Sequence, residues 1–160
     1  MSKAKNMRLG IMLISLLLTK TALSQSRVDS LVEVVSDHLA ATFYCDNGLC
    51  KGFVVEYYPN GQPKIQGKFR KGHPKHVTEF FDNGRLKLDR FYRKRRLVTS
   101  YSYLPSGQLS RKIDWKRRLD VVFFYDSSGR PIRMTESNIR DYSNIVTTTY
   151  LQVNGKWIEQ

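Results

Sequence analysis

The sequence is poor in the residues that catalytic and metal sites most often use. It contains 3 histidines and 2 cysteines among 160 residues, and its 14 acidic residues are scattered along the chain. It has no Gly-x-Ser-x-Gly nucleophile motif and no glycine-rich phosphate-binding loop. His73 and His76 stand three residues apart, but two imidazoles without further ligands do not make a zinc site. We therefore expect no catalytic residues, no metal and no cofactor.

Long apolar runs are also scarce, and the longest lies near the amino terminus. Residues 9–18 carry no charge, follow Lys3, Lys5 and Arg8, and precede a small-residue segment that ends at Ser24. The run is shorter than the roughly 20 residues of a membrane-spanning helix. This order is typical of a secretory signal peptide. We expect residues 1–24 to be cleaved near Ser24/Gln25 and the protein to be exported to the periplasm, the outer surface or the medium. An uncleaved amino-terminal anchor is the alternative.

The two cysteines, Cys45 and Cys50, flank a short Asp-Asn-Gly segment that favours a tight turn. An exported chain meets an oxidising compartment, where disulfides persist. Two interpretations fit this pattern, a local disulfide staple and a redox-active pair. The spacing is not Cys-x-x-Cys and no βαβ pattern surrounds it, so we favour the staple.

Acidic residues are far fewer than basic residues. The chain has 27 Lys and Arg residues against 14 Asp and Glu residues, and loss of residues 1–24 leaves 23 against 14, a formal charge of +9. A charge of this size biases a small domain towards anionic partners without naming one.

The remaining sequence repeats a unit of about 23 residues, as internal alignment of its glycines shows. The stretches "YYPNGQPKIQGKFRKG", "FFDNGRLKLDRFYRKR", "YLPSGQLSRKIDWKRR" and "FYDSSGRPIRMTESNI" share one turn and similar flanking segments. The repeat turns carry Gly61, Gly84, Gly107, Gly129 and, in a partial last copy, Gly155. Each copy contains two short segments rich in aromatic and β-branched residues, which favour strands. The pattern predicts an all-β antiparallel meander. Residues 27–39 fit either a helix or a strand, and we favour a strand that caps the sheet.

These motifs resemble the MORN repeat, and in particular the variant found in bacterial antitoxin-like proteins. The match is closest in "EYYPNGQPKIQGKFRKG" and extends over about residues 41–155. The resemblance implies an elongated, twisted, single-layer sheet that acts as an interaction or membrane-association scaffold. It divides the chain into a signal peptide (1–24), an N-terminal capping segment (25–40) and a MORN-like β-repeat domain (41–160). Later copies have Arg95 and Arg118 where the family has a second glycine.

Aromatic residues recur at fixed offsets from the repeat glycine. Because equal offsets fall on the same face of a sheet, they are expected to stack in two columns. One column is Tyr57, Phe80 and Tyr103, and the other is Phe69, Tyr92 and Trp115. The columns fit either a core or a groove for a peptide or glycan, and we favour the core.

Basic residues also recur, nine to twelve positions after a repeat glycine. They are Arg70, Lys71, Arg93, Lys94, Arg95, Arg96, Lys116, Arg117 and Arg118. Two interpretations fit, solvated turns and a binding ridge along one edge of the sheet. Glu56 and Glu79 also share an offset and are candidates to pair with basic residues. We expect an exported repeat scaffold, not an enzyme, that binds an unknown protein through a basic edge and an aromatic face. The alternative is a peripheral binder of anionic membrane lipid or envelope polymer; nucleic acid fits the charge, but an exported chain rarely meets it.

Overall fold

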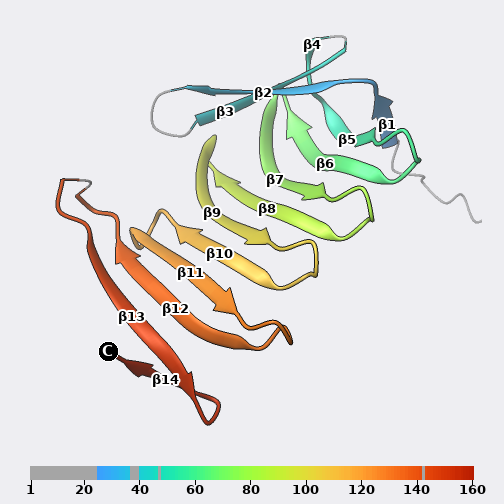
Figure 1. Ribbon diagram of the computed structural model, residues 1–160. Coiled ribbons are helices and arrows are strands. Elements are labelled where there is room, and N and C mark those ends of the chain that lie inside the picture. Colours follow the sequence, from blue (N-terminus) through green and yellow to red (C-terminus); the bar gives the residue numbers. More distant parts are fainter. Residues whose placement is uncertain (1–24, 37–39, 47, 142) are drawn as a thin grey trace, which may run out of the picture.

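The computed structural model describes residues 25–36, 40–46, 48–141 and 143–160. These residues form one open β-sheet of 14 strands, most of them antiparallel (Figure 1). No helix occurs in this part of the chain, so the all-β prediction is confirmed. The predicted signal peptide, with its cleavage site near Ser24/Gln25, lies outside the described residues apart from Gln25 itself.

The amino-terminal strands are short. They are β1 (Gln25–Val28), β2 (Leu31–Ser36), β3 (Ala40–Cys45) and β4 (Gly48–Leu49). The repeats form the remaining ten strands. They are β5 (Gly52–Tyr57), β6 (Pro63–Arg70), β7 (His73–Phe80), β8 (Leu86–Arg93), β9 (Arg96–Tyr103), β10 (Leu109–Asp114), β11 (Leu119–Tyr125), β12 (Pro131–Asn138), β13 (Val146–Val153) and β14 (Lys156–Glu159).

From β5 to β14 every strand pairs with the next one in antiparallel register, which confirms the predicted β-meander. The repeat glycines lie in the turns that follow β5, β7, β9, β11 and β13. Gly61 and Gly84 have φ angles of 82° and 79°, in the left-handed region that glycine adopts without strain. Each donates its N–H to the carbonyl oxygen three residues earlier, at 2.9 Å in both cases. Identical turns thus stack the copies into a regular, twisted ladder (Figure 1).

The segment predicted to cap the sheet forms strands and not a helix. β1 pairs with β5 in parallel and closes the first edge of the ladder. β2 and β3 form a hairpin that runs across the ends of the first ladder strands (Figure 1). The backbone N–H of Phe43 donates to Gly72 O at 2.8 Å, and that of Ala41 donates to Arg95 O at 3.2 Å. The hairpin therefore joins the turn after β6 to the turn after β8.

The main core lies between this hairpin and the first ladder strands. The side chains of Phe43 and Val77 are completely buried, and eight residues form the cluster. The cluster consists of Ala41, Phe43, Cys50, Val54, Ile65, Phe69, Val77 and Tyr92. Among the described residues from β10 onward, only Val121 and Ile139 are buried apolar residues. The hairpin thus makes the first two copies the most firmly packed part of the ladder.

Cys45 and Cys50 form a disulfide, as predicted for a local staple. The bond joins the end of β3 to the residue that follows β4, and Cys50 is part of the core. The covalent link fixes the hairpin close to the first repeat.

Candidate functional site

Three basic turns follow one another along one edge of the sheet, at the ends of β6, β8 and β10. In the first turn Lys71 and Gly72 have φ angles of 50° and 75°, and in the second Lys94 and Arg95 have 49° and 72°. Two consecutive left-handed residues define a type I′ hairpin turn. The third turn is longer and holds Arg118 at a φ of 59°. These basic turns lie at the residues where the sequence predicted the second turn of each copy.

The nine basic residues at these turns are all exposed. They are Arg70, Lys71, Arg93, Lys94, Arg95, Arg96, Lys116, Arg117 and Arg118, and are called the basic ridge below. Within the described residues, only Arg117 of the nine forms an ion pair, with Asp114 at 3.7 Å. The other eight charges of the ridge have no carboxylate partner in that part of the chain.

A groove of about 780 Å³, called the first groove, lies between the first and second basic turns. Its lining combines cations with apolar surface. The apolar part comes from Leu49, Pro74 and the ring of Tyr92. The cationic part comes from Arg70, Lys71, Lys75, Arg93, Lys94 and Arg95. This combination suits a ligand that carries negative charge next to apolar groups.

The second groove, of about 630 Å³, lies between the second and third basic turns. Leu97, Val98 and Trp115 supply its apolar lining. Its cations are Arg93, Lys94, Arg96, Lys116 and Arg118. Arg93 and Lys94 line both grooves, so the two grooves are adjacent and share one basic turn.

One lining residue of each groove has a buried nitrogen without a hydrogen-bond partner among the described residues. In the first groove it is Nδ1 of His73, and in the second it is Nε1 of Trp115. Buried polar atoms are normally paired, so these two are exceptions. The indole N–H of Trp115 is a donor only.

The second predicted aromatic column is divided between the core and the grooves. The ring of Phe43 lies 5.1 Å from that of Phe69 and 6.3 Å from that of Tyr92, measured between centroids. Phe69 and Tyr92 are 4% and 8% exposed, so both are core residues, while Trp115 is half-buried in the second groove. Burial raises the pKa of the Tyr92 hydroxyl far above its usual value, with Arg90 opposing this shift.

The first predicted column consists of half-buried residues near the other edge. Tyr57, Phe80 and Tyr103 end β5, β7 and β9, next to the turns that carry the repeat glycines. The guanidinium of Arg27 lies 5.2 Å from the centre of the Tyr57 ring. The column therefore lies far along the strands from the basic ridge and takes no part in the grooves.

The structure also shows an aromatic strip that the sequence did not indicate. The rings of His76 and Phe91 are stacked at 4.4 Å between centroids, and Phe91 meets Tyr101 edge-on at 6.2 Å. Lys112 lies 5.8 Å from the centre of the Tyr101 ring, and His76 pairs with Asp89. These residues come from four successive strands. They do not share one offset from the repeat glycine, so comparison of the copies could not find them.

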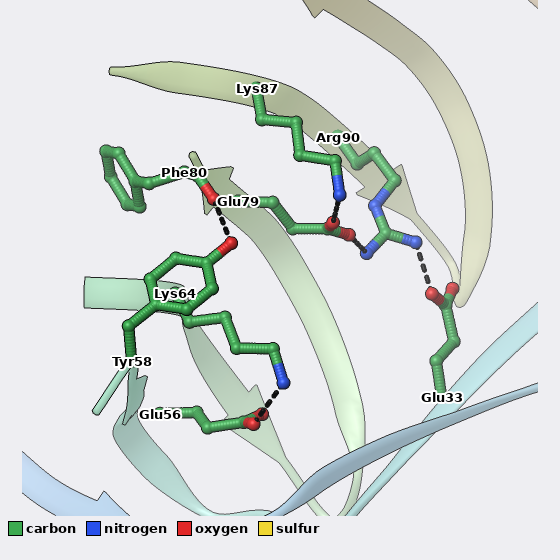
Figure 2. A network of polar contacts seen from close by, with 8 residues as sticks. All are labelled: Glu33, Glu56, Tyr58, Lys64, Glu79, Phe80, Lys87 and Arg90. Atoms are coloured by element: carbon green, nitrogen blue, oxygen red, sulfur yellow. Dashed lines mark hydrogen bonds and ion pairs between the residues drawn. The ribbon is translucent and has the colours of Figure 1, made fainter. Parts of the chain in front are cut away.

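Glu56 and Glu79 pair with basic residues, as their shared offset suggested. Glu56 lies 2.6 Å from Lys64, and Glu79 lies 3.9 Å from Lys87, which has the same position in the next copy (Figure 2). The hydrogen bond from Lys64 to Glu56 raises the pKa of Lys64. The pairing thus repeats from copy to copy.

Arg90 connects this ladder of ion pairs to the hairpin. Its guanidinium lies between Glu79, at 2.6 Å, and Glu33 of β2, which it also contacts (Figure 2). Burial acts to lower the pKa of Arg90, but Tyr92, Glu33 and Glu79 more than reverse that effect and the pKa is raised. The arrangement therefore links the hairpin to the ladder.

The turns with the repeat glycines form the opposite edge, where side chains bind the backbone of the next copy. Asn60 Nδ2 donates to Asp82 O at 2.8 Å, and Arg85 Nη1 donates to Pro105 O at 3.1 Å. Gln108 Nε2 donates to Gly129 O at 3.1 Å. The turn glycines of this edge are Gly61, Gly84, Gly107, Gly129 and Gly155. This edge is therefore joined by side chains across copies.

No cluster of three or more potential metal ligands occurs among the described residues. His73 and His76 lie on the same strand, but His76 faces Asp89 while His73 lines the first groove. In the same residues no helix is long and apolar enough to cross a membrane.

The fold and the ridge define a class of protein, an open all-β repeat ladder with a basic edge. No family model matches the chain. No curated protein matches it either. It is similar to part of a chain in the crystal structure of the GtfA/B complex bound to UDP and GlcNAc, with 13% identity and a TM-score of 0.34. The match covers 73% of this chain and 23% of that one, and at this TM-score it carries no argument about function.

Proposed function

We propose that the protein is an exported scaffold of MORN-type repeats that binds an acidic protein partner along its basic ridge. The observation that carries this proposal is the ridge itself, in which eight of nine exposed cations lack a carboxylate partner among the described residues. Cationic turns of this kind attract anionic groups and speed their encounter with the protein. The scaffold acts by display and needs no chemistry of its own.

Three features support this proposal. The disulfide between Cys45 and Cys50 suits an oxidising compartment outside the cytosol. The apolar lining of both grooves offers contact to side chains as well as to charges. The hairpin holds the first two basic turns in place through Phe43 and Ala41, so the ridge is ordered before a partner arrives.

A second candidate is a peripheral binder of anionic membrane lipid or envelope polymer. The regular succession of basic turns favours it, because a linear or planar array of charges meets such a ridge at several points. Charge alone would then hold the ligand, and its affinity would fall steeply as salt screens the interaction.

A set of matched variants tests the proposal. The ridge variant carries Arg93→Ser, Lys94→Asn and Lys116→Ser, and the control variant carries Lys51→Ser, Arg140→Ser and Lys156→Ser, three exposed cations outside the ridge. Both lose the same charge. Asparagine is chosen at residue 94 because it tolerates the left-handed conformation.

The probes are poly-glutamate, vesicles that contain phosphatidylglycerol, and a polyuronate, each titrated at rising salt concentration. The proposal expects poly-glutamate to bind the native protein and the control variant about equally, and the ridge variant at least tenfold more weakly. Poly-glutamate binding that is equal in the two variants would show that the ridge is not the site. Tighter binding to vesicles or polyuronate than to poly-glutamate would favour the second candidate.

A further inference from the structure

The basic turns recur along the ridge with a fixed step. Successive turns are two strands apart, because each copy contributes two strands to the ladder. Neighbouring strands lie about 4.8 Å apart, so one copy advances the ridge by about 9.6 Å. The first and second grooves lie on either side of one shared turn, and a ligand that fills both must repeat its charged group at this step.

The edge offers side chains and little free backbone. Phe43 N–H donates to Gly72 O, Gly72 N–H donates to Cys50 O, and Ala41 N–H donates to Arg95 O. These bonds use main-chain groups of the first two basic turns that a strand added along this edge would need. A partner segment is therefore recognised through its side chains, not by extension of the sheet.

The repeat step can be compared with the ways in which a peptide presents one face. In a β-strand the same face recurs about every 6.7 Å. In an α-helix one turn advances about 5.4 Å. In a polyproline II helix every third residue returns to the same face after about 9.3 Å. Only the last value matches the step of the ridge directly. A polyproline II backbone is also fully solvated and requires no partner for its own polar groups.

From this match we infer that the first and second grooves form one two-point site for an acidic segment in polyproline II conformation, with an acidic residue at every third position. One carboxylate meets the cations of the first groove, and the next meets those of the second, while Arg93 and Lys94 lie between them. Intervening proline rings contact the solvent-accessible apolar lining, which is Leu49 in one groove and Trp115 in the other.

This inference rests on the proposed function and adds the conformation and charge period of the partner. Two fluorescent peptides of equal composition test it by anisotropy with the purified, disulfide-bonded protein. The first repeats Pro-Pro-Glu four times. The second has the same eight prolines and four glutamates, but with the glutamates adjacent. We expect the first peptide to bind about tenfold more tightly.

A variant that removes two cations of the second groove, and none of the first groove, completes the test. Lys116→Ser with Arg118→Asn should abolish the advantage of the periodic peptide and leave both peptides with similar, weaker binding. The control variant, with Lys51, Arg140 and Lys156 replaced by serine, should retain the full advantage. Replacing alternate prolines of the periodic peptide by glycine, which removes its stiffness, should weaken its binding towards that of the second peptide.

The outcomes separate the two proposals. If both peptides bind the native protein equally well and neither binds the ridge variant, the three-residue charge period is contradicted. That result would still agree with an acidic protein partner. Binding of neither peptide to the native protein would overturn both. A helical peptide with glutamates seven residues apart that binds more tightly than the periodic peptide would also overturn the polyproline II assignment.

Discussion

Phe43 donates its backbone N–H to the carbonyl oxygen of Gly72 at 2.8 Å, although β3 runs across the ladder and belongs to none of its copies. At Gly72 an added Cβ would lie 3.0 Å from Phe43 O and 2.7 Å from Cδ2 of Leu49. Arg95 has the equivalent position in the next copy and also accepts a hydrogen bond from β3, through Ala41 N–H. The same turn position thus requires glycine in one copy and holds arginine in the next.

Gly72→Ala should destabilise the protein strongly. The φ of 75° is unfavourable for alanine by roughly 1–2 kcal/mol, and the clash with a backbone oxygen adds to this, for a total of about 3 kcal/mol. Urea denaturation measures the loss. Gly61→Ala is the matched control, because Gly61 has a φ of 82° but nothing within 4 Å of an added Cβ. If Gly72→Ala lowers the free energy of unfolding no more than Gly61→Ala does, the close packing of the hairpin against Gly72 does not contribute to stability.

Arg95→Gly should stabilise the fold and weaken binding at the same time. Arg95 has a φ of 72°, and glycine relieves this strain, although its greater freedom in the unfolded chain offsets part of the gain. We expect a net gain of about 0.5 kcal/mol in the free energy of unfolding. Affinity for the periodic acidic peptide should fall severalfold. A variant that is more stable and binds equally well would show that the arginine side chain has no part in the site.

Loss of the disulfide should lower stability by a moderate amount. Cys45 and Cys50 are five residues apart, and closure of so short a loop contributes about 2 kcal/mol in the chain-entropy description. The double replacement by alanine and the native protein in reductant should show a similar shift in thermal midpoint. Thiol titration of the unfolded protein, with and without reductant, checks that the bond was present. Equal thiol counts under the two conditions would contradict the bond itself.

Arg90→Met should cost about 3 kcal/mol, because it leaves the carboxylates of Glu33 and Glu79 without their shared cation. The Arg90 side chain is only 11% exposed. Arg111→Met is the control, since Arg111 pairs with Asp120 at 2.6 Å but is 50% exposed, and its loss should cost about 1 kcal/mol or less. Chemical denaturation of the two variants compares them. Equal losses would show that the hairpin does not depend on Arg90.

Asp126 should contribute to stability in a manner that depends on pH. Hydrogen bonds from the Ser128 side chain and then from the Arg130 backbone N–H lower its pKa from 3.8 to about 2. Folding therefore favours the ionised carboxylate of Asp126. Its contribution to the free energy of unfolding is complete above pH 4 and is lost as the pH falls through about 2. Acid titration followed by circular dichroism should show a steeper loss between pH 4 and 2 in the native protein than in Asp126→Asn. Parallel curves would contradict the shift.

The ladder was predictable because its signal repeats. Gly61 and Gly84 mark equivalent turns, and Glu56 and Glu79 gave the ion pairs through a shared offset. The hairpin was not predictable in its placement, because the contact of Phe43 with Gly72 uses backbone atoms that any residue possesses. The sequence predicted a strand over residues 27–39 that caps the sheet, but it did not indicate that β3 crosses the basic turns.

The candidate site was predictable only in part for a related reason. The ridge residues were found by their offsets, but the grooves between them also depend on Leu49, Pro74 and Val98, which occupy no shared position in the copies. Trp115 was grouped with Phe69 and Tyr92 because all three have the same offset. It differs from them because, among the described residues, the core cluster that contains Phe43 of β3 takes in Phe69 and Tyr92 and not Trp115.

The bonds from Asn60, Arg85 and Gln108 to the backbone of the next copy occur only at the edge opposite the ridge. These bonds oppose separation of neighbouring copies at that edge, as the hairpin bonds do at the first two basic turns. At the ridge, the third basic turn is linked to the segment after β12, because Ile139 N–H donates to Arg118 O at 2.8 Å, so both edges of the ladder hold neighbouring copies together.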